Sequence, residues 1–130
     1  MADLYAFLHP VAPENVTEDV VISDRFKNQD GTVASFKIKA LTKGEVERIA
    51  RQCRAKHPGK DFDVDIEMGN RMILAATVEP DFSNKELCEA YGTLDPLEVV
   101  SKMLLYGEAN KLAAAISKLS GADTAVDIKN

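Results

Sequence analysis

The spacing of apolar residues changes along the chain, from a period of two to a helical period. Residues 16–26 and 32–40 alternate between apolar and polar side chains, as half-buried β-strands do. The two runs flank Asn28-Gln29-Asp30-Gly31, a typical turn sequence. We therefore predict a β-hairpin over residues 16–40. Its apolar face must pack on helices or on another subunit, because a lone hairpin is marginally stable in water.

Helical spacing begins after residue 41. Thr42 and Glu45 match a capping box, and the helix that follows is ended by Pro58-Gly59. A polar loop is predicted at Lys60–Asp65. The apolar stripe of this first helix consists of Val46, Ile49, Ala50 and Cys53.

The next segment, residues 66–78, also has a helical pattern, and Pro80 ends it. Its last part, Met72–Val78, is apolar enough that a strand is an open alternative, because short apolar runs do not distinguish the two. The residues predicted to face the core are Ile66, Met72, Ile73 and Ala76.

Three more helices are predicted within Glu79–Leu119, at about 84–91, 96–105 and 108–120. Their boundaries carry N-cap residues with a carboxylate three positions later, a proline at a first helical position, or a glycine suited to a C-cap. The N-cap pairs are Ser83 with Glu86 and Asp95 with Glu98, the proline is Pro96, and the glycines are Gly92 and Gly121.

These elements predict an α+β fold, with an N-terminal β-hairpin followed by about five α-helices in a single compact domain. The length of 130 residues is that of one domain. The expected segments are an N-terminal arm (1–15), the hairpin (16–40), a helical part (42–121) and a flexible tail (122–130). Within the arm, Asp3–Leu8 is predicted to form a short apolar turn or helix.

Composition narrows the classes of partner. The formal net charge is −5, from 16 basic and 21 acidic residues, which argues against nucleic acid as the main partner. Cys53 and Cys88 are too few for a secreted disulfide scaffold and are expected to be reduced thiols in a cytosolic protein. No apolar run approaches the roughly 18 residues of a membrane span. The first ten residues lack the basic start and long apolar run of a signal peptide.

No set of residues matches a catalytic, cofactor or metal motif. The acidic run from Asp61 to Glu67 alternates like the start of a calcium loop, but the required glycine and glutamate are absent. Cys53 and His57 are four residues apart on a helix, yet no third group orients them, so a buried structural cysteine is the favoured interpretation. The same helix has a basic side that suits solvent or an acidic protein partner, made of Lys43, Arg48, Arg51, Arg54 and Lys56.

The consecutive apolar residues Leu104, Leu105 and Tyr106 cannot all face one core from a regular helix. Either one of them is exposed and marks an interface, or all three are buried in a tight corner between two helices. The alanines from Ala109 to Ala115 allow another helix to approach closely, within the chain or between chains.

Several sequence blocks occur in the order found in one protein family. They are the hairpin VVISDRFKNQDGTVASFKIKAL, the helix RIARQC, the loop FDVD, and the segments NRMILAATVEPDFSNKELCEAYG and LDPLEVVSKMLLYGEANKLAAAISKLSG. From about Val20 to Gly121 the chain resembles the XkdN-like phage tail assembly chaperone family. Its most specific parts, ATVEPDFSNKELCEAYG and KMLLYGEANKL, are structural signatures and contain no active site.

The resemblance implies a non-enzymatic factor, without cofactor, in the cytoplasm of the bacterial host. Such proteins bind the tape measure protein, keep its helical segments soluble and help tail tube subunits polymerise around it; a homo-oligomer is also compatible. The alternative is a structural tail component, an adaptor or terminator, retained in the virion. Many such genes also yield a longer product by frameshifting, which the residues Ile128-Lys129-Asn130 permit. We predict a partner-binding surface on the last two helices, formed by Leu104, Leu105, Tyr106, Leu112 and Ile116.

Overall fold

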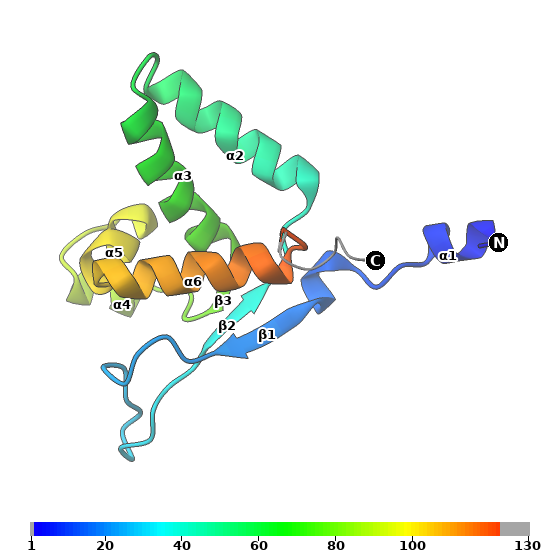
Figure 1. Ribbon diagram of the computed structural model, residues 1–130. Helices are drawn as coiled ribbons and strands as arrows, with labels where there is room; N and C mark the ends of the chain where they lie inside the picture. Colours follow the sequence, from blue (N-terminus) through cyan, green and yellow to red (C-terminus); the bar gives the residue numbers. More distant parts are fainter. Residues whose placement is uncertain (1, 123–130) are drawn as a thin grey trace.

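A small antiparallel sheet lies against a group of helices in the computed structural model, which describes residues 2–122 (Figure 1). The predicted α+β class is confirmed. The elements in chain order are α1 (Leu4–Leu8), the 3₁₀ turn η1 (Pro13–Asn15), β1 (Thr17–Val20), β2 (Phe36–Lys39), α2 (Lys43–Lys56), α3 (Asp61–Ala76), β3 (Thr77–Glu79), α4 (Lys85–Ala90), α5 (Pro96–Met103) and α6 (Tyr106–Leu119).

The predicted hairpin is present, with strands shorter than the alternating runs. β1 and β2 pair antiparallel, from Thr17 opposite Lys39 to Val20 opposite Phe36. The chain between the strands then projects as a long loop (Figure 1). Gly31 turns the tip of this loop with φ of +90°, a conformation that favours glycine. The alternation beyond the strands still reports burial correctly, since Ile22 is 2% exposed.

A third strand, left open as an alternative within Met72–Val78, is present at Thr77–Glu79. β3 pairs antiparallel with the other side of β2, so the sheet order is β1-β2-β3. The segment that was ambiguous between helix and strand contains both, because α3 runs to Ala76 and β3 begins at Thr77. Three residues are too few to show an alternation of their own, and only pairing with β2 makes them a strand.

The predicted polar loop at Lys60–Asp65 is wrong, because α3 begins at Asp61. Asp61 and Asp63 lie in its first turn, where the helix dipole favours carboxylates. The prediction that Ile66 faces the core is also wrong, since its side chain is 50% exposed. Ile66 shares a helix face with the buried Ile73, but α6 covers that face only at the Ile73 end (Figure 1).

The helices that follow differ from the prediction at two places. α5 ends at Met103 and α6 begins at Tyr106, each two residues earlier than predicted, and the cap of α4 also differs. Asp95 caps α5 by accepting a hydrogen bond from the Leu97 N–H at 3.0 Å. The cap of α4 is Asn84 rather than Ser83, and its side chain accepts from the Leu87 N–H at 3.0 Å. The difference arises because Asp81 already engages the Ser83 N–H at 2.9 Å, which starts the helix one residue later.

The main core lies between the sheet, α3, α5 and α6. α6 crosses α3 and also packs on β1 and β2, so it joins the helical hairpin α2–α3 to the sheet (Figure 1). The residues at its centre are Ile38, Ile73, Phe82, Val99, Val100, Leu112 and Ile116, each at most 1% exposed.

The predicted tail 122–130 falls, apart from Ala122, outside the described residues, and so do Ile128–Asn130, which the frameshift hypothesis concerns. No helix among residues 2–122 is long and apolar enough to cross a membrane.

Candidate partner-binding surface

The structure separates the five predicted partner-binding residues into two groups. Leu112 and Ile116 are fully buried on the inner face of α6, and Leu104 is 8% exposed. In this conformation these three side chains belong to the core, because the stripe that their helical spacing reports is the one that packs on the sheet and α3. Leu105 and Tyr106 are 57% and 85% exposed. The tight buried corner considered as an alternative for this triplet is therefore wrong.

An ion pair fixes the corner that presents these two residues. α5 ends at Met103 and α6 begins at Tyr106. Arg25, from the loop after β1, donates to both oxygens of Glu108, at 2.9 Å from Nε and 2.6 Å from Nη2. The same Nη2 donates to the Met103 carbonyl at 2.6 Å. One guanidinium thus ties the end of α5 to the first turn of α6.

Glu108 completes the corner by accepting the Leu105 N–H at 2.8 Å, which caps α6. Its side chain is 7% exposed, against 43% for Arg25. The hydrogen bonds from Arg25 are the main cause that lowers the pKa of the Glu108 carboxyl from 4.5 to about 2. The carboxylate is therefore charged at physiological pH, so its ion pair with Arg25 continues to hold the end of α5 to the start of α6.

Beside this corner lies an apolar hollow of about 510 Å³, which we call the α3–α6 groove. Its rim carries two exposed aromatic side chains, Phe62 from the first turn of α3 and Tyr106 from the first turn of α6, 75% and 85% exposed. Ile66 lines it between them, and the buried Ile73 forms its floor. An exposed apolar surface rimmed by polar residues is typical of a protein-binding site.

Small residues deepen the groove. Gly69 of α3 lines it, opposite Ala109 and Ala113 of α6. A glycine inside a helix costs about 1 kcal/mol relative to alanine. Within residues 2–122, no atom of another element lies within 4 Å of the position that a Cβ on Gly69 would take. Packing inside the chain therefore does not require this glycine, and its missing side chain leaves room for a helix from outside.

The sequence did not indicate that Phe62, Ile66 and Gly69 belong to a surface. The available signal was an aromatic residue within an acidic run, Asp61-Phe62-Asp63, which is unusual for a solvated loop.

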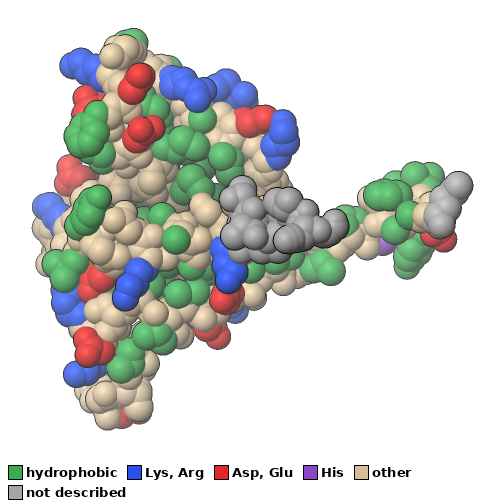
Figure 2. Space-filling view, viewed as in Figure 1, with side chains coloured by type: hydrophobic (Ala, Val, Ile, Leu, Met, Phe, Trp, Pro, Cys, Tyr) green, Lys and Arg blue, Asp and Glu red, His purple; other side chains and the backbone are tan. Residues whose placement is uncertain are grey.

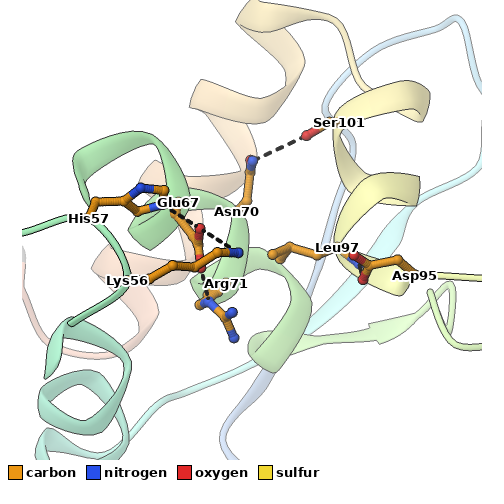
Figure 3. A network of polar contacts seen from close by, with 8 residues as sticks. All are labelled: Lys56, His57, Glu67, Asn70, Arg71, Asp95, Leu97 and Ser101. Atoms are coloured by element: carbon orange, nitrogen blue, oxygen red, sulfur yellow. Dashed lines mark hydrogen bonds and ion pairs between the residues drawn. The ribbon is translucent and has the colours of Figure 1, made fainter. Parts of the chain in front are cut away.

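The buried cysteine favoured by the sequence is confirmed at Cys53, and His57 belongs to a carboxylate network (Figure 3). His57 Nε2 lies 2.8 Å from Glu67 Oε1, and Arg71 Nε donates to Glu67 Oε2 at 2.6 Å. Lys56 Nζ adds an ion pair at 3.3 Å. These partners, His57 first, lower the pKa of the Glu67 carboxyl to about 2. Glu67 thereby joins the end of α2 to the middle of α3, a structural role for a buried charge.

Cys53 itself is fully buried beneath this network. Burial raises the pKa of its thiol, so the reactive thiolate is disfavoured. Among residues 2–122, no three His, Cys, Asp or Glu side chains are grouped so as to hold a metal ion.

The basic side of α2 faces solvent, and Figure 2 shows Lys and Arg side chains along that helix. Two of its members have acidic neighbours within the chain, Lys43 with Glu47 and Lys56 with Glu67. No aromatic side chain lies between these charges in the sequence, so the surface lacks the stacking platform of a single-stranded nucleic-acid site.

Comparisons with known proteins agree on one family. The family model described as phage XkdN-like tail assembly chaperone protein matches residues 4–129. YqbN of Bacillus subtilis (strain 168), described as uncharacterized, is 34% identical over 128 residues, covering 93% of this chain and 85% of YqbN. XkdN, from the phage-like element PBSX of the same strain, is 33% identical over 121 residues, covering 88% and 82% of the two chains. A crystal structure of YqbN matches with a TM-score of 0.75 and 28% identity, over 93% of this chain and 98% of that one.

Proposed function

The chain belongs to the phage XkdN-like tail assembly chaperone family, and we propose that it binds helical segments of the tape measure protein through the α3–α6 groove. As a member of that family it is not an enzyme. The binding step takes place in the cytoplasm of the bacterial host, before the tail tube closes around its partner. Tail tube subunits are the second expected partner.

The observation that carries this proposal is the shape and chemistry of the groove. Its small residues Gly69, Ala109 and Ala113 allow a helix backbone to approach closely, while Phe62 and Tyr106 stand exposed at its rim. An amphipathic helix laid with its apolar face in an apolar groove is a recurrent mode of recognising helical peptide segments. Aromatic side chains of this kind commonly supply much of the binding free energy.

Co-expression with the tape measure protein tests the proposal. The wild-type chain should keep the tape measure protein soluble and co-purify with it. Tyr106→Ser and Phe62→Ser together should reduce the co-purified amount at least tenfold, because two exposed anchors are lost. Leu94→Ser is the matched control, since Leu94 is 88% exposed and does not line the groove. Equal recovery with the double variant and with the control would refute binding through the groove.

One observation favours the alternative of a structural tail component. β1 is an edge strand of the sheet and could accept a strand from another subunit. Its central residues Glu18 and Asp19 are charged, however, and such side chains disfavour edge-to-edge pairing. Mass spectrometry of mature particles separates the two functions, because a chaperone is absent from them and a structural component is abundant.

A further inference from the structure

Residues 2–12 of the N-terminal arm are the most exposed apolar part of the described chain. α1 contains no buried residue, and the arm extends away from the body (Figure 1). In the space-filling view its surface is largely apolar (Figure 2). The large side chains exposed there are Leu4 69%, Tyr5 68%, Phe7 70%, Leu8 63% and Val11 70%.

α1 is nevertheless a defined helical turn. The Tyr5 carbonyl accepts the His9 N–H at 3.0 Å, and the two rings stack with centroids 4.1 Å apart. A five-residue helix is not stable alone in water, because nucleation costs more than so few hydrogen bonds return. A surface that covers its apolar side chains would stabilise both the turn and the arm.

The arm is attached at the far end of α6 from the groove. The Ala40 N–H donates to the Val16 carbonyl at 2.9 Å, and the Leu41 N–H donates to Ser120 Oγ at 2.9 Å. These bonds hold the base of the arm beside the last turn of α6, whereas the rim residue Tyr106 lies in its first turn. The arm then points outward from the body of its own chain (Figure 1).

The apolar area that the arm can bury favours a second copy of this chain, and not a single short ligand, as the partner of the arm. Five side chains exposed to this degree offer on the order of 600–700 Å² per arm. A specific interface needs about 800 Å² from each partner. One arm in one groove falls short of that. When two copies exchange arms, each contributes its arm and its groove, and the requirement is exceeded.

The chemistry of the two surfaces also matches. Residues 2–12 carry one charged side chain, Asp3, so the contact is apolar. We propose that the arm of one copy docks in the α3–α6 groove of a second copy, and the reverse, to form an arm-exchanged dimer. This inference rests in part on the proposed function. If the groove is the tape measure site, the arm occupies it until the tape measure protein displaces the arm, and the dimer is the form without bound partner.

Sedimentation equilibrium of the full chain between 1 and 200 µM tests the exchange. The wild type should approach twice the 14.2 kDa of one chain. Leu4→Ser with Phe7→Ser should weaken dimerisation by at least about 100-fold, because two apolar anchors are lost from each of the two arms. Gly69→Leu, which fills the groove from an open position, should do the same. Leu94→Ser is the control and should dimerise as the wild type does.

Mixing the two defective chains gives the sharpest result. The arm variant keeps an intact groove and Gly69→Leu keeps an intact arm, so their mixture should form heterodimers through one arm–groove contact, which neither variant can form alone. Because one contact has half the area of the exchanged dimer, these heterodimers should be much weaker than the wild-type dimer and should appear only toward 200 µM. Because α1 has no buried residue, the arm variant should melt at the wild-type temperature at protein concentrations where the wild type is monomeric. A wild type that stays monomeric throughout, or an arm variant that dimerises normally, would overturn the exchange. If the wild type is monomeric and only the arm variant binds an apolar dye in the groove, the arm docks in the groove of its own chain, and the exchange is also overturned.

The outcome is independent of the tape measure assay. An arm variant that is monomeric and still keeps the tape measure protein soluble would support both proposals. A normal dimer that binds no tape measure protein would refute the proposed function alone.

Discussion

Replacing Glu108 by glutamine tests whether the Arg25–Glu108 pair holds the α5–α6 corner. Glutamine keeps the size of the side chain and its acceptor for the Leu105 N–H but removes the charge that Arg25 binds. A fall in the pKa of Glu108 from 4.5 to about 2 corresponds to at most about 3 kcal/mol. Arg25 is 43% exposed, so solvent screening reduces this to about 1–2 kcal/mol.

The pH dependence gives a sharper signature than the loss of stability alone. The pKa of Glu108 is lower in the folded chain, so its contribution is fully present above pH 4.5. It is lost progressively as the pH falls toward 2. The free energy of unfolding of Glu108→Gln should therefore lie about 1–2 kcal/mol below wild type at pH 6.5, with most of this gap gone near pH 2.5.

Urea unfolding at a series of pH values measures this gap. Glu89→Gln is the control, because Glu89 is an exposed carboxylate of the neighbouring helix α4. It should follow the wild-type curve at every pH. A gap for Glu108→Gln that is the same at pH 6.5 and pH 2.5 would show that the charge of Glu108 does not stabilise the corner, and the reasoning would fail.

Three further changes probe the rest of the fold. Glu67→Gln should lower the free energy of unfolding by about 1–2 kcal/mol at pH 6.5 and lose this effect over the same acid range, since the pKa of Glu67 is also about 2; a pH-independent loss in urea titrations would contradict this. Thr77→Val should raise the free energy of unfolding by about 1 kcal/mol, seen as a higher melting temperature. The Thr77 hydroxyl is buried without a hydrogen-bond partner among the described residues, and a lower melting temperature would show that it has one. Asn84→Ala should cost about 1 kcal/mol in thermal unfolding and Ser83→Ala almost nothing, and the reverse order would restore Ser83 as the cap of α4.

Local signals in the sequence were sufficient for most helix boundaries. The capping box at Thr42, the Asp95–Pro96 start and the glycines Gly92 and Gly121 all act where their chemistry predicts. What could not be predicted depends on contacts between distant residues. β3 is a strand only because β2 lies beside it, and Arg25 meets Glu108 across 83 positions of sequence.

The candidate surface was predicted in part, and the division has a physical reason. A helical stripe reports which residues are buried in the chain's own core, so Leu112 and Ile116 are the residues that such a stripe selects, and they are inside. Leu105 and Tyr106 were found because a run of three apolar residues departs from the stripe. Phe62 departs from its acidic surroundings in the same way.

The exposed apolar residues that break the local pattern therefore carry more information about partners than the periodic ones. Phe62 and Tyr106 belong to different helices and line the same groove because α6 crosses α3. Arg25 and Glu108 fix the turn from which Tyr106 projects, so the stability of the corner and the shape of the groove are linked. A variant that weakens the ion pair should thus weaken partner binding even though neither charge lines the groove. If the shape of the groove did not depend on the ion pair, such a variant would leave partner binding unchanged, and only substitutions of groove residues would weaken it.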